Sequence, residues 1–101
     1  MKRIVFDPVV RFDLESAKRF LEEQKPGLGE DFMTRVRNQF QYIASYPRTA
    51  RIVEGDVRKI GIEKFKFEIY YRVGDDEIFV MAVLHKRRHQ DTWKGRLRKD
   101  R

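Results

Sequence analysis

The side chains best suited to chemistry gather near the C-terminal end of the chain. His85 is followed by Lys86, Arg87, Arg88 and His89. Histidine titrates near neutral pH and moves protons in general acid–base catalysis. The planar guanidinium of arginine binds phosphate or carboxylate through paired hydrogen bonds. This segment therefore predicts a phosphate-binding element or a surface for an acidic protein.

The excess positive charge lies in the same part of the chain. The 101 residues carry a formal net charge of +7. Residues 86–101 hold eight basic and two acidic side chains, whereas residues 1–47 hold eight and seven. A basic tail from about residue 86 favours a polyanionic partner or an acidic protein. The alternative is a solvated tail that binds nothing.

Several classes of protein are disfavoured by what the sequence lacks. Without cysteine there are no disulfides and no thiolate metal sites. His85 and His89 have no nearby set of carboxylates, so we expect no metal and no cofactor. There is no glycine-rich phosphate loop and no nucleophile elbow. No stretch approaches the ~20 apolar residues of a membrane span, and the N-terminus does not resemble a signal peptide. We expect a cytoplasmic protein without a membrane partner.

The length and the hydrophobic periodicity predict one domain over residues 1–101. A strand is expected over residues 2–6. A first helix follows with Asp13 as its N-cap and ends at Lys25-Pro26-Gly27. A second helix is expected from about Gly29 to Tyr46-Pro47, which gives a helical hairpin.

After a polar loop, Arg48 to Asp56, the apolar period changes to two. Strands are expected over residues 57–62, 67–73 and 78–85, with a hairpin turn at residues 74–77. The predicted fold is therefore α+β. The helical hairpin packs on one face of a mainly antiparallel four-stranded sheet.

The predicted turn also sets a strand register. Val73 would lie opposite Ile78, and the same register pairs Tyr71 with Val80, Ile69 with Ala82, and Phe67 with Leu84. That apolar face is expected to carry the helices. The opposite face would expose a mixed set of side chains that needs a cover. Its members are Lys59, Glu68, Tyr70, Arg72, Phe79, Met81, Val83 and His85.

Two polar features of this arrangement have alternative interpretations. Glu68 would lie diagonally from His85, as an acid–base pair or as a structural polar pair. Trp93 would anchor the tail on the core or contact a partner. Arg58, on the core side of an outer strand, is expected to bond a loop carbonyl or carboxylate.

A set of segments, in this order, resembles the RelE/ParE toxin family over nearly the whole chain. They are Asp13-Leu14, Pro26-Gly27-Leu28-Gly29 with Phe32, Ile43-Ala44-Ser45-Tyr46-Pro47, Val57-Arg58-Lys59-Ile60, Phe65 through Tyr70-Tyr71-Arg72-Val73, and Ala82-Val83-Leu84-His85 with Arg87-Arg88 and Trp93. The resemblance implies a β-α-α-β-β-β fold. It also implies the toxin of a bacterial type II toxin–antitoxin (plasmid stabilisation) system, with a cognate antitoxin and a toxin–antitoxin hetero-oligomer.

The family implies two routes to toxicity. RelE-like members are ribosome-dependent mRNA endonucleases, whereas ParE-like members inhibit DNA gyrase. Lys59 matches the first of two nuclease lysines, but Gly61 stands at the second position and Glu68 at a nuclease arginine. A glutamate there repels the phosphate that the arginine would bind. The ParE-like branch therefore fits better.

The resulting expectation is a non-enzymatic gyrase inhibitor. Residues expected to contact the antitoxin or the target are Tyr70, Arg72, Phe79, Met81, Val83, His85, Arg87, Arg88 and Trp93. A nuclease would instead use Lys59, Glu68, His85, Lys86 and Arg87. A third interpretation is an inactive toxin relic that only binds its antitoxin as a corepressor.

Overall fold

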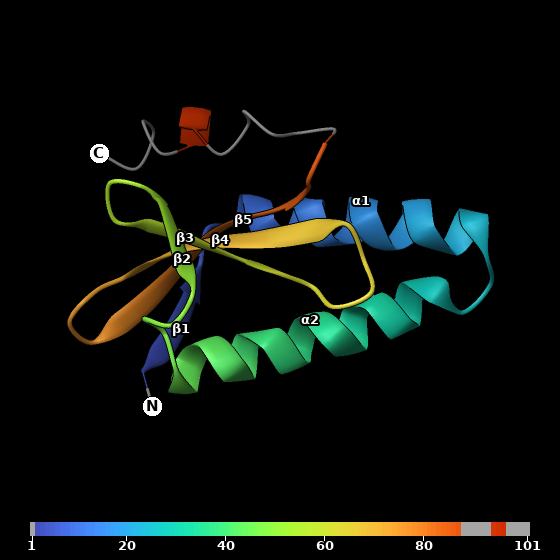
Figure 1. Ribbon diagram of the computed structural model, residues 1–101. Helices are drawn as coiled ribbons and strands as arrows, with labels where there is room; N and C mark the ends of the chain where they lie inside the picture. Colours follow the sequence, from blue (N-terminus) through green and yellow to red (C-terminus); the bar gives the residue numbers. More distant parts are fainter. Residues whose placement is uncertain (1, 88–93, 97–101) are drawn as a thin grey trace.

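The computed structural model describes residues 2–87 and 94–96. Strand β1 (Arg3–Phe6) leads into helices α1 (Val9–Gln24) and α2 (Leu28–Ser45), followed by strands β2 (Arg51–Glu54), β3 (Val57–Gly61), β4 (Phe67–Val73) and β5 (Glu77–His85). The strand order in the sheet is β1-β5-β4-β3-β2. β1 runs parallel to β5, and the other neighbours are antiparallel. In Figure 1 the two helices form a hairpin against the sheet. In the described part of the chain, neither helix is long and apolar enough to cross a membrane.

The α+β class and the helical hairpin are confirmed, but the prediction of a four-stranded sheet was wrong. The fifth strand, β2, lies in the segment expected to be a polar loop. After β2 the chain turns back at Gly55, whose positive φ of 57° suits glycine. β2 then pairs antiparallel with β3, with Arg51 opposite Lys59. Because most of this short edge strand is exposed, it shows no alternation of apolar and polar residues.

Helix α1 begins earlier than the sequence predicts. It starts at Val9, whose N–H donates to the Asp7 carboxylate (2.9 Å), and Pro8 precedes it. The prediction of Asp13 as N-cap was therefore wrong, because Asp13 lies inside the helix and bonds elsewhere. Helix α2 agrees with its predicted range and begins after Gly27, whose φ is 91°.

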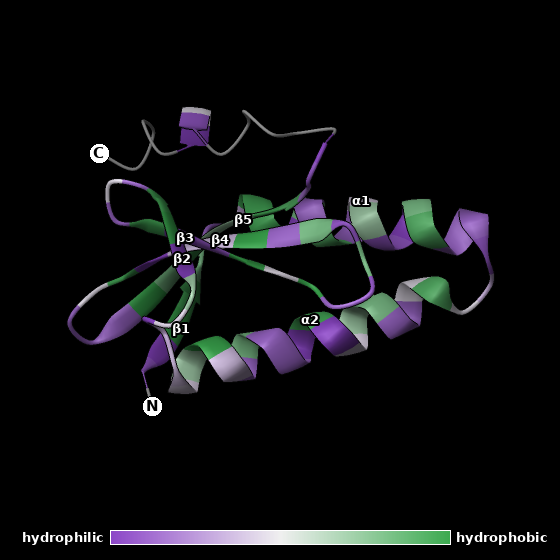
Figure 2. Ribbon diagram, viewed as in Figure 1, coloured by the Kyte–Doolittle hydropathy of each residue, from purple (hydrophilic) through white to green (hydrophobic). Residues whose placement is uncertain are grey.

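The helix face of the sheet, the face covered by α1 and α2, contains the main core. Its buried side chains come from both helices, from β4 and β5, and from Ile62 directly after β3, and β5 is coloured largely as hydrophobic in Figure 2. They are Val10, Ala17, Leu21, Phe32, Val36, Ile43, Ile62, Phe67, Ile69, Tyr71, Ile78, Val80 and Val83. The Tyr71 hydroxyl donates a hydrogen bond to the Pro47 carbonyl (2.8 Å), so this buried hydroxyl has a hydrogen-bond partner.

A β-bulge at Met81 corrects the predicted register between β4 and β5. Tyr71 lies opposite Val80 as predicted, but Tyr70 lies opposite Ala82, so Met81 is an extra residue on β5. After this extra residue, each side chain of β5 lies on the face opposite to the predicted one. Val83 lies in the helix-face core, whereas Ala82 and Leu84 lie in a second cluster. The predicted pairs of Ile69 with Ala82 and of Phe67 with Leu84 were therefore wrong.

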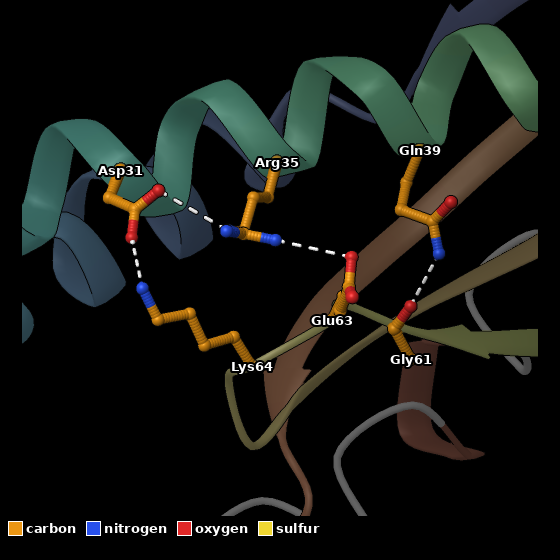
Figure 3. A network of polar contacts seen from close by, with 6 residues as sticks. All are labelled: Asp31, Arg35, Gln39, Gly61, Glu63 and Lys64. Carbon is orange, nitrogen blue, oxygen red and sulfur yellow. Dashed lines mark hydrogen bonds and ion pairs between the residues drawn. The ribbon is translucent and has the colours of Figure 1, made fainter.

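A polar network joins α2 to the β3–β4 connection (Figure 3). Arg35 contacts both Asp31 and Glu63 at 3.2 Å, and Lys64 contacts Asp31 at 3.1 Å. Gln39 donates to the Gly61 carbonyl at 2.6 Å. The hydrogen bond from Lys64, helped by Arg35, lowers the pKa of Asp31. The network holds the β3–β4 connection against helix α2.

Candidate functional site

The second face, the side of the sheet away from the helical hairpin, carries a buried polar cluster. The Lys59 Nζ lies 3.2 and 3.3 Å from the two oxygens of the Glu68 carboxylate. Tyr70 donates its hydroxyl to the same carboxylate at 3.2 Å. Glu68 is only 7% exposed. Because Glu68 neutralises Lys59, this cluster presents little net positive charge to a phosphate.

Burial and the neighbouring carboxylate act in the same direction on Tyr70. Desolvation, and then the negative charge of Glu68, raise the pKa of Tyr70 well above its ordinary value. The phenol therefore stays protonated at physiological pH and acts as a hydrogen-bond donor. It is unsuited to act as a base in proton transfer.

The apolar cluster of the second face is largely buried. Its cluster consists of Val57, Tyr70, Met81, Ala82 and Leu84, with Val53 and Phe79 packed against it. Met81 is 0% exposed, and Tyr70 is buried with it. Tyr70 and Met81 lie together on the predicted face, but the expectation that Val83 lies there with them was wrong. Tyr70 and Met81 are buried on the second face, and Val83 is buried on the helix face.

His85 also lies on the helix face. Its ring packs edge-on against Phe67 with centroids 5.2 Å apart, and its Nδ1 accepts the Arg87 N–H at 3.1 Å. Glu68 points to the second face, so the predicted Glu68–His85 pair is wrong. The bulge at Met81 is the reason, because it reverses the direction of every later side chain on β5.

The remaining residues of the predicted binding and catalytic sets are less buried or lie outside the described residues. Arg72 is half-buried and donates to the Asp56 carboxylate at 3.1 Å. Phe79 is half-buried, whereas Lys86 and Arg87 are exposed. The Lys86 N–H continues the sheet by donating to the Lys66 carbonyl (2.9 Å). Arg88 and Trp93 lie outside the described residues.

The prediction for Arg58 is confirmed. Its Nη1 donates to the carbonyls of Arg48 (3.0 Å) and Ala50 (2.8 Å). This arginine fixes the segment before β2. Its role in the structure is therefore local and structural.

An ion pair between α1 and the C-terminal segment was not predicted. Asp13 accepts hydrogen bonds from Arg96 at 2.6 and 2.8 Å and from the Val83 N–H at 3.0 Å. Arg96 also donates to the Met81 carbonyl at 3.2 Å. The hydrogen bond from Arg96 to Asp13 raises the pKa of the guanidinium. The available signal is that Asp13 follows buried Val10 by three residues, which places a carboxylate at a core-facing helical position.

A groove of about 660 Å³ opens between the start of α1 and helix α2. Its walls include Phe6, Leu14, Met33 and Phe40, and Phe12 at its margin is 65% exposed. The rings of Phe6 and Phe40 meet edge-on with centroids 5.0 Å apart. Exposed aromatic surface of this kind is typical of a partner or ligand contact.

The described part of the chain contains no group of three histidine, cysteine or carboxylate side chains able to hold a metal. A helical hairpin on one face of a mixed five-stranded sheet defines a small α+β domain. The family described as "ParE toxin of type II toxin-antitoxin system, parDE" matches residues 4–90. The chain belongs to this family.

A solved structure described as "Chromosomal ParDE TA system from P. aeruginosa" has the same fold, with a TM-score of 0.74 and 17% sequence identity. The match covers 84% of this chain and 96% of that chain. A search of curated proteins found no match.

Proposed function

We propose that this protein is a toxin that inhibits DNA gyrase without catalysing a reaction and is neutralised by a cognate antitoxin. The family membership supports the toxin role. The observation that favours the gyrase route is the neutralised Lys59–Glu68 pair, because an mRNA endonuclease needs uncompensated positive charge at that place.

The other groups of the nuclease hypothesis are also poorly placed. Gly61 supplies no side chain where a second cation is expected. His85 lies on the helix face, whereas Lys59 and Glu68 meet on the second face. A general acid or base must lie within hydrogen-bond reach of the reacting atoms. These three side chains do not meet that condition around one phosphate.

The antitoxin is expected to cover the groove beside Phe12 and Phe6. Those aromatic side chains are exposed, whereas most apolar side chains of the second face are buried and Phe79 is half-buried. Burying exposed apolar surface stabilises a complex. A Phe12→Asp variant should therefore weaken antitoxin binding at least tenfold, because it places a charge in the apolar contact. A matched Arg19→Asp change on the exposed side of α1 should have little effect.

Purified components separate the candidate functions. The protein is added to a gyrase supercoiling assay and, separately, to programmed ribosomes on which mRNA cleavage is measured. Inhibited supercoiling with intact mRNA supports the proposal. Cleaved mRNA with normal supercoiling contradicts it and favours the endonuclease, in which case His85→Ala tests whether histidine takes part. Induction without growth arrest, with antitoxin binding retained, favours the relic.

A further inference from the structure

Beyond the first turn of α2, which carries Glu30 and Asp31, the outer side of the helix and the turn after it have no acidic side chain of their own. Residues 32–53 contain four arginines and no aspartate or glutamate. We call its exposed residues the α2 outer surface. They are Thr34, Arg37, Asn38, Gln41, Tyr42, Ser45, Tyr46 and Arg48.

Helical geometry brings most of these residues together. Positions 34, 37, 38, 41, 42 and 45 are separated by three or four residues and therefore share one side of α2. Tyr46 and Arg48 follow directly at the end of the helix. The result is a continuous strip that faces away from the sheet.

Two tyrosines make an aromatic platform at one end of this strip. The rings of Tyr42 and Tyr46 lie 5.3 Å apart at an angle of 45°, and they are 42% and 58% exposed. The Tyr42 hydroxyl lies 3.1 Å from Thr49 Oγ1, which donates to the Tyr46 carbonyl at 3.0 Å. These hydrogen bonds hold the turn, so part of each ring is presented to solvent in a fixed place.

The arginines of the surface differ from Arg35 on the neighbouring side of the helix. Arg35 is held by Asp31 and Glu63 (Figure 3). Among the described residues, neither Arg37 nor Arg48 forms an ion pair. Arg37 makes only the smallest of the contributions to the lowered pKa of Glu30. Both guanidinium groups therefore remain available to an anion.

We infer that the α2 outer surface binds single-stranded nucleic acid. Phosphate oxygens are contacted in proteins by arginine and by the polar side chains of serine, threonine, asparagine, glutamine and tyrosine. The strip contains these residue types. Unpaired bases stack on exposed aromatic rings, and this stacking does not require a particular base. The tyrosine pair provides such rings at one end of the strip that carries the two arginines.

An acidic protein fits this surface less well. The energetic centre of a protein interface is a desolvated apolar cluster around its aromatic and arginine anchors. Here Asn38 and Gln41 stand between Arg37 and Tyr42, and Thr34 and Ser45 add further polar side chains to the strip. These polar side chains suit a hydrated phosphate backbone. The inference does not depend on the toxin target or on the C-terminal residues.

The test is fluorescence anisotropy with a labelled oligo-dT of 12 nucleotides and the full chain, at moderate salt. Arg37→Glu should weaken binding at least tenfold, and Tyr46→Ala about fivefold, while Tyr46→Phe should preserve it because the ring remains. Arg19→Glu is the matched control. It changes the charge equally on exposed α1, beside Glu15 and Glu23, and should alter binding less than twofold.

Three results would overturn the inference. Equal weakening by Arg37→Glu and Arg19→Glu would assign binding to overall charge. Unchanged binding by Tyr46→Ala, or equal affinity for a duplex, would remove the stacking role. Competition by polyglutamate as effective as by oligo-dT at equal charge would favour an acidic protein. Circular dichroism confirms that each variant is folded.

Discussion

The carboxylate of Asp13 takes the place of a strand at the edge of β5, and Arg96 holds it there. β1 pairs with β5 only as far as Val80. Beyond that point the Val83 N–H donates to Asp13 at 3.0 Å, and Arg96 donates to both Asp13 and the Met81 carbonyl. One ion pair thus satisfies two backbone groups beside the bulge and joins α1 to the C-terminal segment.

Removing the Asp13 carboxylate should be costly. The side chains of Asp13 and Arg96 are only 8% and 16% exposed. An Asp13→Ala variant leaves a buried guanidinium and a buried backbone N–H without their partner, so it should lower the free energy of unfolding by about 3 kcal/mol. Urea denaturation measures this change. Glu15→Ala, on the exposed side of the same helix, is the control, and a similar loss in both variants would contradict the role of the pair.

The sequence predicts those parts of the fold in which apolar and polar residues alternate. The range of α2 follows from its apolar stripe, and the pairs of Val73 with Ile78 and of Tyr71 with Val80 follow from the turn. The bulge at Met81 could not be predicted in this way. Every residue from Ile78 to Leu84 is apolar, so alternation does not show which face each side chain takes.

The candidate site depends on that bulge and was therefore only partly predictable. The proximity of Lys59 to Glu68 and Tyr70 follows from the short β3–β4 connection, where Lys59 lies opposite Tyr70. The position of His85 does not follow, because it lies beyond the extra residue. The Asp13–Arg96 pair joins residues 83 positions apart, and local patterns carry no information on such a contact.

Gly29 is expected to be required for the close approach of the two helices. An added Cβ would lie 2.9 Å from the Lys18 carbonyl oxygen, closer than atoms pack without movement. Gly29→Ala should therefore destabilise the protein by about 1–3 kcal/mol, although alanine favours helices. Thermal and urea unfolding measure the loss. Gly61→Ala is the control, because nothing lies within 4 Å of its added Cβ. Equal free energies of unfolding for the two variants would show that the helices move apart to accommodate the added methyl group without cost.

Glu22 should make the stability of the helical hairpin depend on pH. Its carboxylate accepts the N–H groups of Gly27 (2.9 Å) and Gly29 (3.0 Å), and these bonds lower its pKa below the ordinary 4.5. A lowered folded-state pKa stabilises the protein above pH 4.5, and this stabilisation is lost as the pH falls through the lowered value.

Glu22→Gln should therefore have a lower Tm than the unchanged protein at pH 7, and the two values should converge below pH 4. Thermal unfolding across this range tests the sign. Glu23→Gln removes the same charge from the next residue and should show no such convergence. A Tm difference that persists unchanged at pH 3 would contradict the role of the ionised carboxylate.

The Lys59–Glu68 pair should stabilise the second face as a unit. Lys59→Met leaves the buried carboxylate without its cation, and Glu68→Gln leaves the lysine without its anion. Each should cost about 2 kcal/mol, because the pair is largely but not fully buried. The double variant should cost about 2 kcal/mol as well, since it removes both charges together and the glutamine still accepts from Tyr70.

A double-mutant cycle in urea measures this coupling. Arg72 and Asp56 provide the matched cycle, because their ion pair is of similar length but Asp56 is largely exposed. Arg72→Met and Asp56→Asn should show coupling below about 0.5 kcal/mol. Additive losses at Lys59 and Glu68 would mean that the two charges act independently. The carboxylate would then not neutralise the lysine, and the main structural argument against phosphate chemistry on this face would be lost.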